Sequence, residues 1–285
     1  MTQTQAARLM DGTALARRIV EDTARQAAAL TERTGTAPCL ATVLVGEDPA
    51  SVTYVRMKQN RCRKAGITSR HVALPATTTT AELVGTLREL SADPGVHGIL
   101  LQHPVGDHVD ERAAFEAIAP EKDVDGVTFA SFATMSFGLP GFVSCTPGGI
   151  VRLLDEYGVD PAGKRAVVVG RSAILGKPVG MLLLARDATV TYCHSRTREL
   201  SAAVREADIV VAAVGRPRLI RGQDIKPGAV VIDAGYNPGN VGDVDFDSAV
   251  ERASLITPVP GGVGPMTIAT LLEQTVTAAG RQLGA

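Results

Sequence analysis

The chain has few of the features that mark nucleic-acid-binding, membrane or secreted proteins. Its 29 Lys and Arg residues are balanced by 30 Asp and Glu residues, for a formal net charge of −1. It therefore offers no excess positive charge to attract nucleic acid or an anionic membrane. No apolar run approaches the roughly 20 residues that span a bilayer, and the N-terminus lacks the apolar core of a signal peptide. We expect a cytoplasmic protein that binds neither nucleic acid nor membrane.

Cysteine and histidine are also scarce. The five histidines show no metal-ligand spacing, and the four cysteines lie far apart at Cys39, Cys62, Cys145 and Cys193. The sequence therefore predicts no metal site and no disulfide framework. Cys39 and Cys193 stand in apolar, strand-like runs, and we interpret them as small buried hydrophobic residues.

Helical and strand-like patterns alternate along the chain, which is typical of an α/β protein with largely parallel sheets. Strands are expected at 40–45, 67–73, 96–101, 165–169, 189–193, 209–214 and 229–233. Helices are expected at 14–30, 81–90, 111–118, 150–157, 177–185 and 200–207, and after Pro265. A further helix is capped by Asp48 and ends at Gly66. A loop rich in Gly, Ser and Phe, residues 126–145, is the candidate domain boundary.

Residues 256–267 read Ile-Thr-Pro-Val-Pro-Gly-Gly-Val-Gly-Pro-Met-Thr. The prolines restrict the backbone, the glycines leave it bare of side chains, and Pro265 suits the first turn of a helix. A surface loop that enters a helix is the plainer interpretation of such a run. The order of these residues instead favours a ligand-binding wall, where main-chain atoms meet a flat or anionic ligand.

An apolar strand, a glycine-bounded turn and a helix start follow one another at 167–176. In this context backbone amides and a helix N-terminus hold a pyrophosphate. The spacing, Gly170-x-Ser172-x-x-x-Gly176, differs from the usual G-x-G-x-x-G. A buried turn without a ligand explains these residues equally well.

The charges near this turn indicate which dinucleotide would bind. An NAD site places a carboxylate at the end of the next strand, for the ribose 2′-hydroxyl. Here that strand ends in Cys193-His194-Ser195-Arg196, without a carboxylate. Arg171, Ser195 and Arg196 can neutralise and hydrogen-bond a 2′-phosphate instead. The sequence favours NADP over NAD.

Chemically capable side chains are concentrated in the first half of the chain. Tyr54 and Lys58 are four residues apart on a predicted helix and so share a face. Gln102 follows a predicted strand, at a carboxyl end where open sheets place ligands; Asp123 and Asp125 come later. These residues can stack on a heterocycle, transfer protons and accept hydrogen bonds. Taken singly, each is explained as well by packing, solvation or loop capping.

Segments spread along the chain share their order and spacing with one known family. They are Val45–Ser51 with Tyr54-x-x-x-Lys58, Gly98–Gln102, Lys122–Gly126, Cys145–Pro147, Gly170–Ser172, Val241–Val244 and the run at 256–267. The chain thereby resembles the bifunctional methylenetetrahydrofolate dehydrogenase/cyclohydrolase family. The resemblance implies two α/β domains around a cleft, with a folate-binding catalytic domain at 1–140 plus 266–285. The Rossmann-like NADP-binding domain would then occupy 141–265, and the protein would be a homodimer.

The activity implied by this resemblance has two steps on tetrahydrofolate one-carbon derivatives. NADP⁺ takes a hydride from 5,10-methylenetetrahydrofolate, and water then opens the methenyl product to 10-formyltetrahydrofolate. By the same resemblance Lys58 transfers protons, Gln102 positions Lys58, Tyr54 stacks on the folate and Asp125 holds the pterin. The remaining implied residues are Pro258, Gly261 and Gly262 at the folate, and Arg171, Ser172 and Ser195 at NADP. The turn and the charges described above add Gly170 and Arg196 as candidate cofactor-binding residues.

The chain departs from the family pattern at a few positions. After Gln102 it reads His103-Pro104-Val105-Gly106 where Leu-Pro-Leu-Pro is usual, and Tyr236 stands where isoleucine is usual. His103 is either a second titrating group or an ordinary loop histidine. A specialised paralogue with one of the two activities therefore stays open. So does a silent folate- and NADP-binding protein, although retention of all four chemical residues argues against it.

Overall fold

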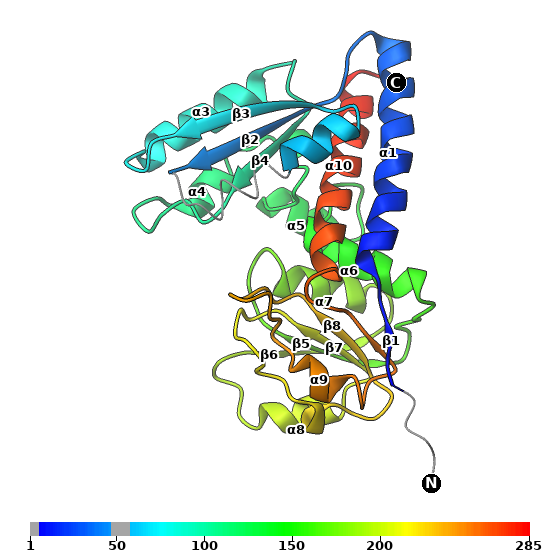
Figure 1. Ribbon diagram of the computed structural model, residues 1–285. Coiled ribbons are helices and arrows are strands. Elements are labelled where there is room, and N and C mark those ends of the chain that lie inside the picture. Colours follow the sequence, from blue (N-terminus) through cyan, green and yellow to red (C-terminus); the bar gives the residue numbers. More distant parts are fainter. Residues whose placement is uncertain (1–5, 47–57) are drawn as a thin grey trace. The chain divides into compact units, whose positions relative to one another are not determined.

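The protein folds into two compact units that each carry a parallel sheet (Figure 1). A computed structural model describes residues 6–46 and 58–285. The six-stranded unit comprises the chain up to Arg17 together with Ser144–Thr267, and the three-stranded unit comprises Arg18–Val143 with Ile268–Ala285. Every pair of neighbouring strands in the described residues is parallel, so the predicted α/β class is confirmed.

The three-stranded unit has the strand order β3-β2-β4. Its central strand β2 is buried along its whole length, as is typical of a parallel strand that is covered on both faces. The strands are β2 (Cys39–Val45), β3 (Thr68–Leu74) and β4 (Gly98–Gln102). The helices are most of α1 (Gly12–Thr34), α3 (Thr80–Ala92), α4 (Glu111–Phe115), η1 (Pro120–Lys122), α5 (Phe129–Ser136) and most of α10 (Val263–Gln282).

The six-stranded unit has the order β1-β9-β8-β7-β5-β6. Its strands are β1 (Arg8–Leu9), β5 (Arg165–Val169), β6 (Thr189–Cys193), β7 (Ile209–Ala212), β8 (Val230–Asp233) and β9 (Leu255–Ile256). Its helices are α6 (Cys145–Glu156), α7 (Gly176–Leu184), α8 (Leu200–Arg205), η2 (Gly222–Asp224) and α9 (Phe246–Ala249). The inner strands β7 and β8 are wholly buried, which explains why their sequences are continuous apolar runs.

One sequence prediction is wrong, and one expected boundary differs. Residues 126–145 are not a continuous loop: they contain α5, whose start is capped by Thr128 accepting a hydrogen bond from the Ser131 amide. The Gly, Ser and Phe content of the segment masked this helix. The chain up to Arg17 belongs to the six-stranded unit because Arg8 and Leu9 pair with β9. A strand of two residues has no periodicity from which to predict it.

The cysteines lie in the hydrophobic core. All four cysteines are buried free thiols, and burial raises the pKa of Cys62 to about 12. In residues 6–46 and 58–285, no group of three or more His, Cys, Asp and Glu side chains is arranged to hold a metal ion. No helix in those residues is long and apolar enough to cross a bilayer.

Candidate functional site

A cavity of about 400 Å³ opens at the carboxyl edge of the six-stranded sheet. The segments that follow three adjacent strands line it: Gly170–Ser172 after β5, His194 and Ser195 after β6, and Val214 and Arg216 after β7. This edge is where open parallel sheets bind their ligands. Four predicted residues, Gly170, Arg171, Ser172 and Ser195, therefore share one cavity.

Close packing explains the unusual glycine spacing at this cavity. Gly170 has φ +140°, and a Cβ there would lie 2.2 Å from the Ala213 carbonyl oxygen. A Cβ at Gly176 would lie 2.6 Å from the Gly170 carbonyl, and one at Gly180 would lie 2.1 Å from the Tyr192 hydroxyl. Each glycine thus allows a backbone approach that any side chain would block. Together they hold the turn against β7 and helix α7 against β6.

Ser172 caps the helix that follows the turn. Its Oγ accepts hydrogen bonds from the Leu175 and Gly176 amides, both at 3.2 Å, and its carbonyl accepts one from the Lys177 amide at 3.0 Å. The first amides of α7 are therefore occupied within the protein. Positive charge for an anionic ligand must come mainly from side chains.

The cavity supplies that charge from two arginines. Arg171 and Arg216 both line it, both are exposed, and neither guanidinium is paired with a carboxylate in the described residues. No Asp or Glu is among the described residues that line it. Arg196 is exposed and does not belong to the lining; its amide donates to His194 Nδ1 at 3.2 Å. The cavity fits a ligand that carries several negative charges.

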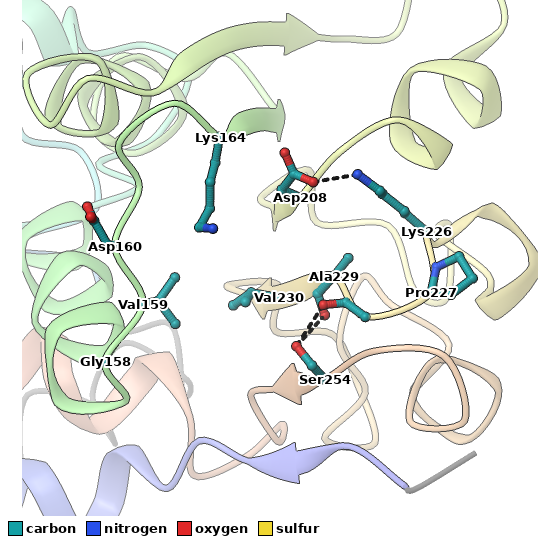
Figure 2. A pocket seen from close by; sticks show the side chains of 11 residues that line it. Gly158, Val159, Asp160, Lys164, Asp208, Lys226, Pro227, Ala229, Val230 and Ser254 are labelled. Carbon is teal, nitrogen blue, oxygen red and sulfur yellow. Dashed lines mark hydrogen bonds and ion pairs between the residues drawn. The ribbon is translucent and has the colours of Figure 1, made fainter. Parts of the chain in front are cut away.

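A second cavity, of about 370 Å³, lies at the opposite, amino edge of the same sheet (Figure 2). Three of its polar side chains have partners within the protein: Lys226 donates to Asp208 at 2.5 Å, and the Ser254 hydroxyl donates to the Gly228 carbonyl at 2.8 Å. The hydrogen bond from Lys226 lowers the pKa of Asp208 below its usual value. These contacts account for Lys226, Asp208 and Ser254 without a ligand, and the lining carries charges of both signs.

The three-stranded unit brings Lys58 and Gln102 together. Lys58 Nζ donates to Gln102 Oε1 at 2.9 Å, and Gln102 Nε2 donates to the His103 carbonyl at 2.9 Å. The second bond fixes the orientation of the amide, so its oxygen faces the lysine. Both side chains are half-buried. Tyr54 lies outside the described residues.

Asp123 and Asp125 have different environments. Asp123 is fully buried and accepts hydrogen bonds from the Val127 amide and from the side chains of Thr128 and Ser131, at 3.1, 2.7 and 2.6 Å. Its carboxylate therefore holds the start of α5. Asp125 is only half-buried, which makes it the more accessible carboxylate of the pair.

The loop that contains Pro258, Gly261 and Gly262 is tied to the start of α1. The Gly262 amide donates to the Pro258 carbonyl at 2.9 Å, and the Thr13 amide donates to the Gly261 carbonyl at 3.0 Å. A Cβ at Gly12 would lie 1.8 Å from the Gly262 carbonyl oxygen, so only glycine fits there. Sequence reasoning missed Gly12, since no motif surrounds it. The predicted place of Pro265 in the first turn of a helix is confirmed, because α10 begins at Val263.

Both parts of the chain match models of one protein family. The tetrahydrofolate dehydrogenase/cyclohydrolase catalytic domain matches residues 10–125, and the NAD(P)-binding domain of the same family matches residues 144–283. The chain belongs to the tetrahydrofolate dehydrogenase/cyclohydrolase family. The cavity with Gly170 and Arg171 thus lies in the family's NAD(P)-binding domain, and Lys58 and Gln102 lie in its catalytic domain.

Individual family members are similar over almost the whole chain. Bifunctional protein FolD 1 from Streptomyces avermitilis is 81% identical over 284 residues, covering 100% of this chain and 99% of the relative. The crystal structure of the bifunctional enzyme FolD from Campylobacter jejuni is 43% identical, with TM-score 0.94. The match covers 97% of this chain and 99% of that one. The Trypanosoma brucei FolD structure, complexed with NADP cofactor and inhibitor, is 40% identical, with TM-score 0.95. The match covers 99% of this chain and 100% of that one.

The structure also locates the departures from the family pattern. The His103 ring packs edge-on to Phe115, with ring centroids 6.4 Å apart. Gln102 contacts the backbone carbonyl of residue 103, so this contact does not depend on which side chain stands there. Gly106 has φ +98°, a conformation that suits glycine. Tyr236 is 57% exposed, and its hydroxyl donates to Asn240 at 2.7 Å.

Two buried carboxylates behind the cofactor-domain cavity were missed as functional candidates. Asp243 accepts hydrogen bonds from the backbone amides of residues 214, 215 and 216, at 2.6, 2.9 and 2.8 Å. Asp233 accepts one from the Asp243 amide at 3.0 Å. Gly235 lies against Asp243, and Gly242 lies against Asp233, so closely that a Cβ would overlap either carboxyl group. Asp243 lies in the family segment Val241–Val244, which could have pointed to it, but the sequence alone assigned this segment no role.

Proposed function

We propose that the protein catalyses the NADP-dependent oxidation of 5,10-methylenetetrahydrofolate to 5,10-methenyltetrahydrofolate, and its hydrolysis to 10-formyltetrahydrofolate. The observation that carries the proposal is the hydrogen bond from Lys58 to Gln102 in the family's catalytic domain. The family resemblance adds Tyr54 as the folate-stacking ring and Asp125 as the pterin-binding carboxylate. It also assigns the loop with Pro258, Gly261 and Gly262 to folate binding.

The cofactor assignment rests on the cavity at the carboxyl edge of the six-stranded sheet. Its turn is built of close-packed glycines, and its lining contains both Arg171 and Ser195 and no carboxylate among the described residues. A guanidinium and a hydroxyl suit a 2′-phosphate, whereas an NAD site would place a carboxylate there. NADP⁺, when bound, supplies the acceptor for the hydride of the first step.

The oxidation requires little acid–base help from the protein. The two folate nitrogens that flank the methylene carbon stabilise the positive charge that develops as the hydride leaves. The contribution of the chain is therefore to orient the folate. Asp125 would do so at the pterin and Tyr54 by stacking.

The hydrolysis does require proton transfer. Water adds to the methenyl carbon and loses a proton to give a neutral hydroxyl adduct. One carbon–nitrogen bond then breaks: the hydroxyl of the adduct loses its proton to leave the formyl group, and the nitrogen of that bond takes up a proton. Lys58 Nζ moves this proton, and Gln102 Oε1 holds Nζ in place by accepting its hydrogen bond at 2.9 Å. The Gln102 amide is itself oriented by the His103 carbonyl. The unusual side chain at residue 103 therefore leaves this arrangement intact.

The test follows both products at once. Purified protein is mixed with 5,10-methylenetetrahydrofolate and NADP⁺, and NADPH and the methenyl compound are measured separately. We expect NADPH without methenyl accumulation. Lys58→Met should slow the hydrolysis of supplied methenyltetrahydrofolate by at least about a hundredfold, the usual contribution of a positioned proton-transfer group. Lys64→Met, an exposed lysine on the same helical segment, is the matched control and should leave hydrolysis unchanged.

Each other outcome has a defined meaning. Hydrolysis by Lys58→Met at the parental rate would remove Lys58 from the mechanism. Methenyl accumulation with the parental protein would identify a paralogue that keeps only the dehydrogenase. Folate binding without NADPH formation would contradict both activities and identify a silent binding protein.

The proposal also covers assembly and location. On the family resemblance, the protein is a homodimer; on the sequence features described above, it works in the cytoplasm. Sedimentation analysis of the purified protein should give the mass of two chains, and a monomer at micromolar concentration would overturn the dimer. Fractionation of cells that produce the protein should recover it with cytoplasmic markers, whereas recovery with membranes would overturn the location.

A further inference from the structure

The cofactor cavity carries one more positive charge than the resemblance accounts for. Arg171 enters it from the turn after β5, and Arg216 enters it from the segment after β7. Of the residues that the structure describes, no carboxylate pairs with either guanidinium. Two like charges that face one cavity repel each other unless an anion lies between them. The pair therefore indicates a ligand group with more than one negative charge.

A buried carboxylate holds the backbone segment that carries Arg216. The fully buried carboxylate of Asp243 accepts the amides of three successive residues, the last being Arg216 itself at 2.8 Å. Asn237 Nδ2 also donates to this carboxylate at 3.1 Å. A residue on an otherwise exposed loop is thus held in position. Less conformational freedom is lost when such a side chain binds a ligand.

We infer that Arg216 is a second binding residue for the 2′-phosphate of NADP, acting together with Arg171. The inference rests on the proposed function, because it assigns the same cavity to NADP. A phosphate monoester carries between −1.5 and −2 charges near neutral pH, by the usual second pKa of about 6, which matches two guanidiniums better than one. Ser195 and Thr197, after β6, line the same cavity at the position where the 2′-substituent of a dinucleotide is recognised. Arg196, the sequence candidate, is outside that lining.

The test measures binding without turnover. Adenosine 2′,5′-bisphosphate and AMP differ only in the 2′-phosphate, and their dissociation constants are measured by calorimetry at constant ionic strength. Arg216→Gln should weaken bisphosphate binding by about tenfold or more, the usual effect of losing a charge-assisted hydrogen bond, and should change AMP binding by less than about twofold. Arg216→Lys should restore part of the loss. Kinetics should agree: the KM for NADP⁺ rises, while kcat and the KM for NAD⁺ stay near parental values.

The controls separate this inference from the proposed function. Arg218→Gln changes an exposed arginine two residues further along that does not line the cavity, and it should leave both dissociation constants unchanged. Equal weakening of AMP and bisphosphate by Arg216→Gln would overturn the inference, because the residue would then serve the 5′-phosphate or the fold. Unchanged bisphosphate binding would overturn it too. If Arg171→Gln also left bisphosphate binding unchanged, the proposed NADP site itself would fail.

Discussion

The two edges of the six-stranded sheet each carry a cavity, of about 400 and 370 Å³, yet only one has the character of a ligand site. At the amino edge Lys226 pairs with Asp208 and the Ser254 hydroxyl is bound to backbone (Figure 2). At the carboxyl edge Arg171 and Arg216 have no carboxylate partner among the described residues. Cavity volume alone therefore does not identify a site. The sign of the lining charges separates the two: the carboxyl edge carries two arginines and no carboxylate among the described residues, whereas the amino edge mixes Lys164 and Lys226 with Asp160 and Asp208.

One carboxylate at each edge shows a related difference: Asp208 is partly exposed, whereas Asp233 is buried. Asp208, at the amino edge, has a lowered pKa because Lys226 donates to it. Asp233, the last residue of β8 at the carboxyl edge, has its pKa raised to about 6, mainly by burial. At neutral pH the buried charge of Asp233 is therefore unfavourable for folding. It lies at the edge where buried carboxylates hold the loops in place. Three substitutions test this contrast.

The largest expected effect is that of Gly170→Ala at the carboxyl edge. The new Cβ would lie 2.2 Å from the Ala213 carbonyl oxygen at a positive φ, so we expect a loss of about 3 kcal/mol or more in the free energy of unfolding. Gly228→Ala, at the amino edge, is the matched control: φ is +81° but no atom lies within 4 Å. It should cost only about 1 kcal/mol. Urea unfolding of both variants measures the difference, and equal losses would contradict the close-packing argument.

The next effect is the pH dependence that Asp233 imposes. Because its pKa rises from 3.8 in the unfolded chain to about 6 in the folded protein, the folded state binds an extra proton between these values. The Asp233 contribution to stability is present below pH 3.8 and is lost as the pH rises through about 6. That loss is on the order of 3 kcal/mol. In Asp233→Asn this decrease of the free energy of unfolding with rising pH should vanish. Urea unfolding of the parental protein and of the variant at pH 4.5 and pH 7 measures the difference. A parental slope in the variant would show that other groups cause it.

The smallest effect is that of Asp208→Asn at the amino edge. The side chains of Asp208 and Lys226 are 32% and 44% exposed, so removing their ion pair should cost less than about 1 kcal/mol at pH 7. The lowered pKa makes this contribution present above pH 3.8 and lost as the pH falls below it, opposite to Asp233. Unfolding at pH 7 and pH 3.5 checks the sign. The KM for NADP⁺ should not change; a rise would mean that the amino edge also serves the cofactor.

Much of the fold was predictable where the local pattern is strong. The strands at 165–169 and 189–193 were predicted at their observed bounds because an apolar run between turn residues is a local signal. The two-residue strands β1 and β9 carry no such signal, since only their pairing with each other and with β8 defines them. Helix α5 was missed because the Gly, Ser and Phe content of its segment masked it, and the buried carboxylate that holds its start, Asp123, contacts Ser131 eight positions away.

The candidate site was predictable as a set of residue types but not as an arrangement. The contact of Lys58 with Gln102 joins residues 44 positions apart, and no periodicity reports such a distance. Asp123 and Asp125 look alike in the sequence, yet only Asp123 is fully buried, where it accepts hydrogen bonds from the side chains of Thr128 and Ser131. The roles of Tyr54, Asp125 and the loop at 256–267 in folate chemistry stay predictions.

By itself the sequence determined the α/β class, the family and the chemical character of the site, because alternating patterns and ordered motifs are properties of neighbouring residues. Only the tertiary structure decided which side chains meet. It placed Arg216 with Arg171 in one cavity, left Arg196 outside that lining, and put Asp243 behind the loop that carries Arg216. The physical reason is that β5, β6 and β7 lie side by side in the sheet. Their ends therefore gather residues that are far apart in the chain.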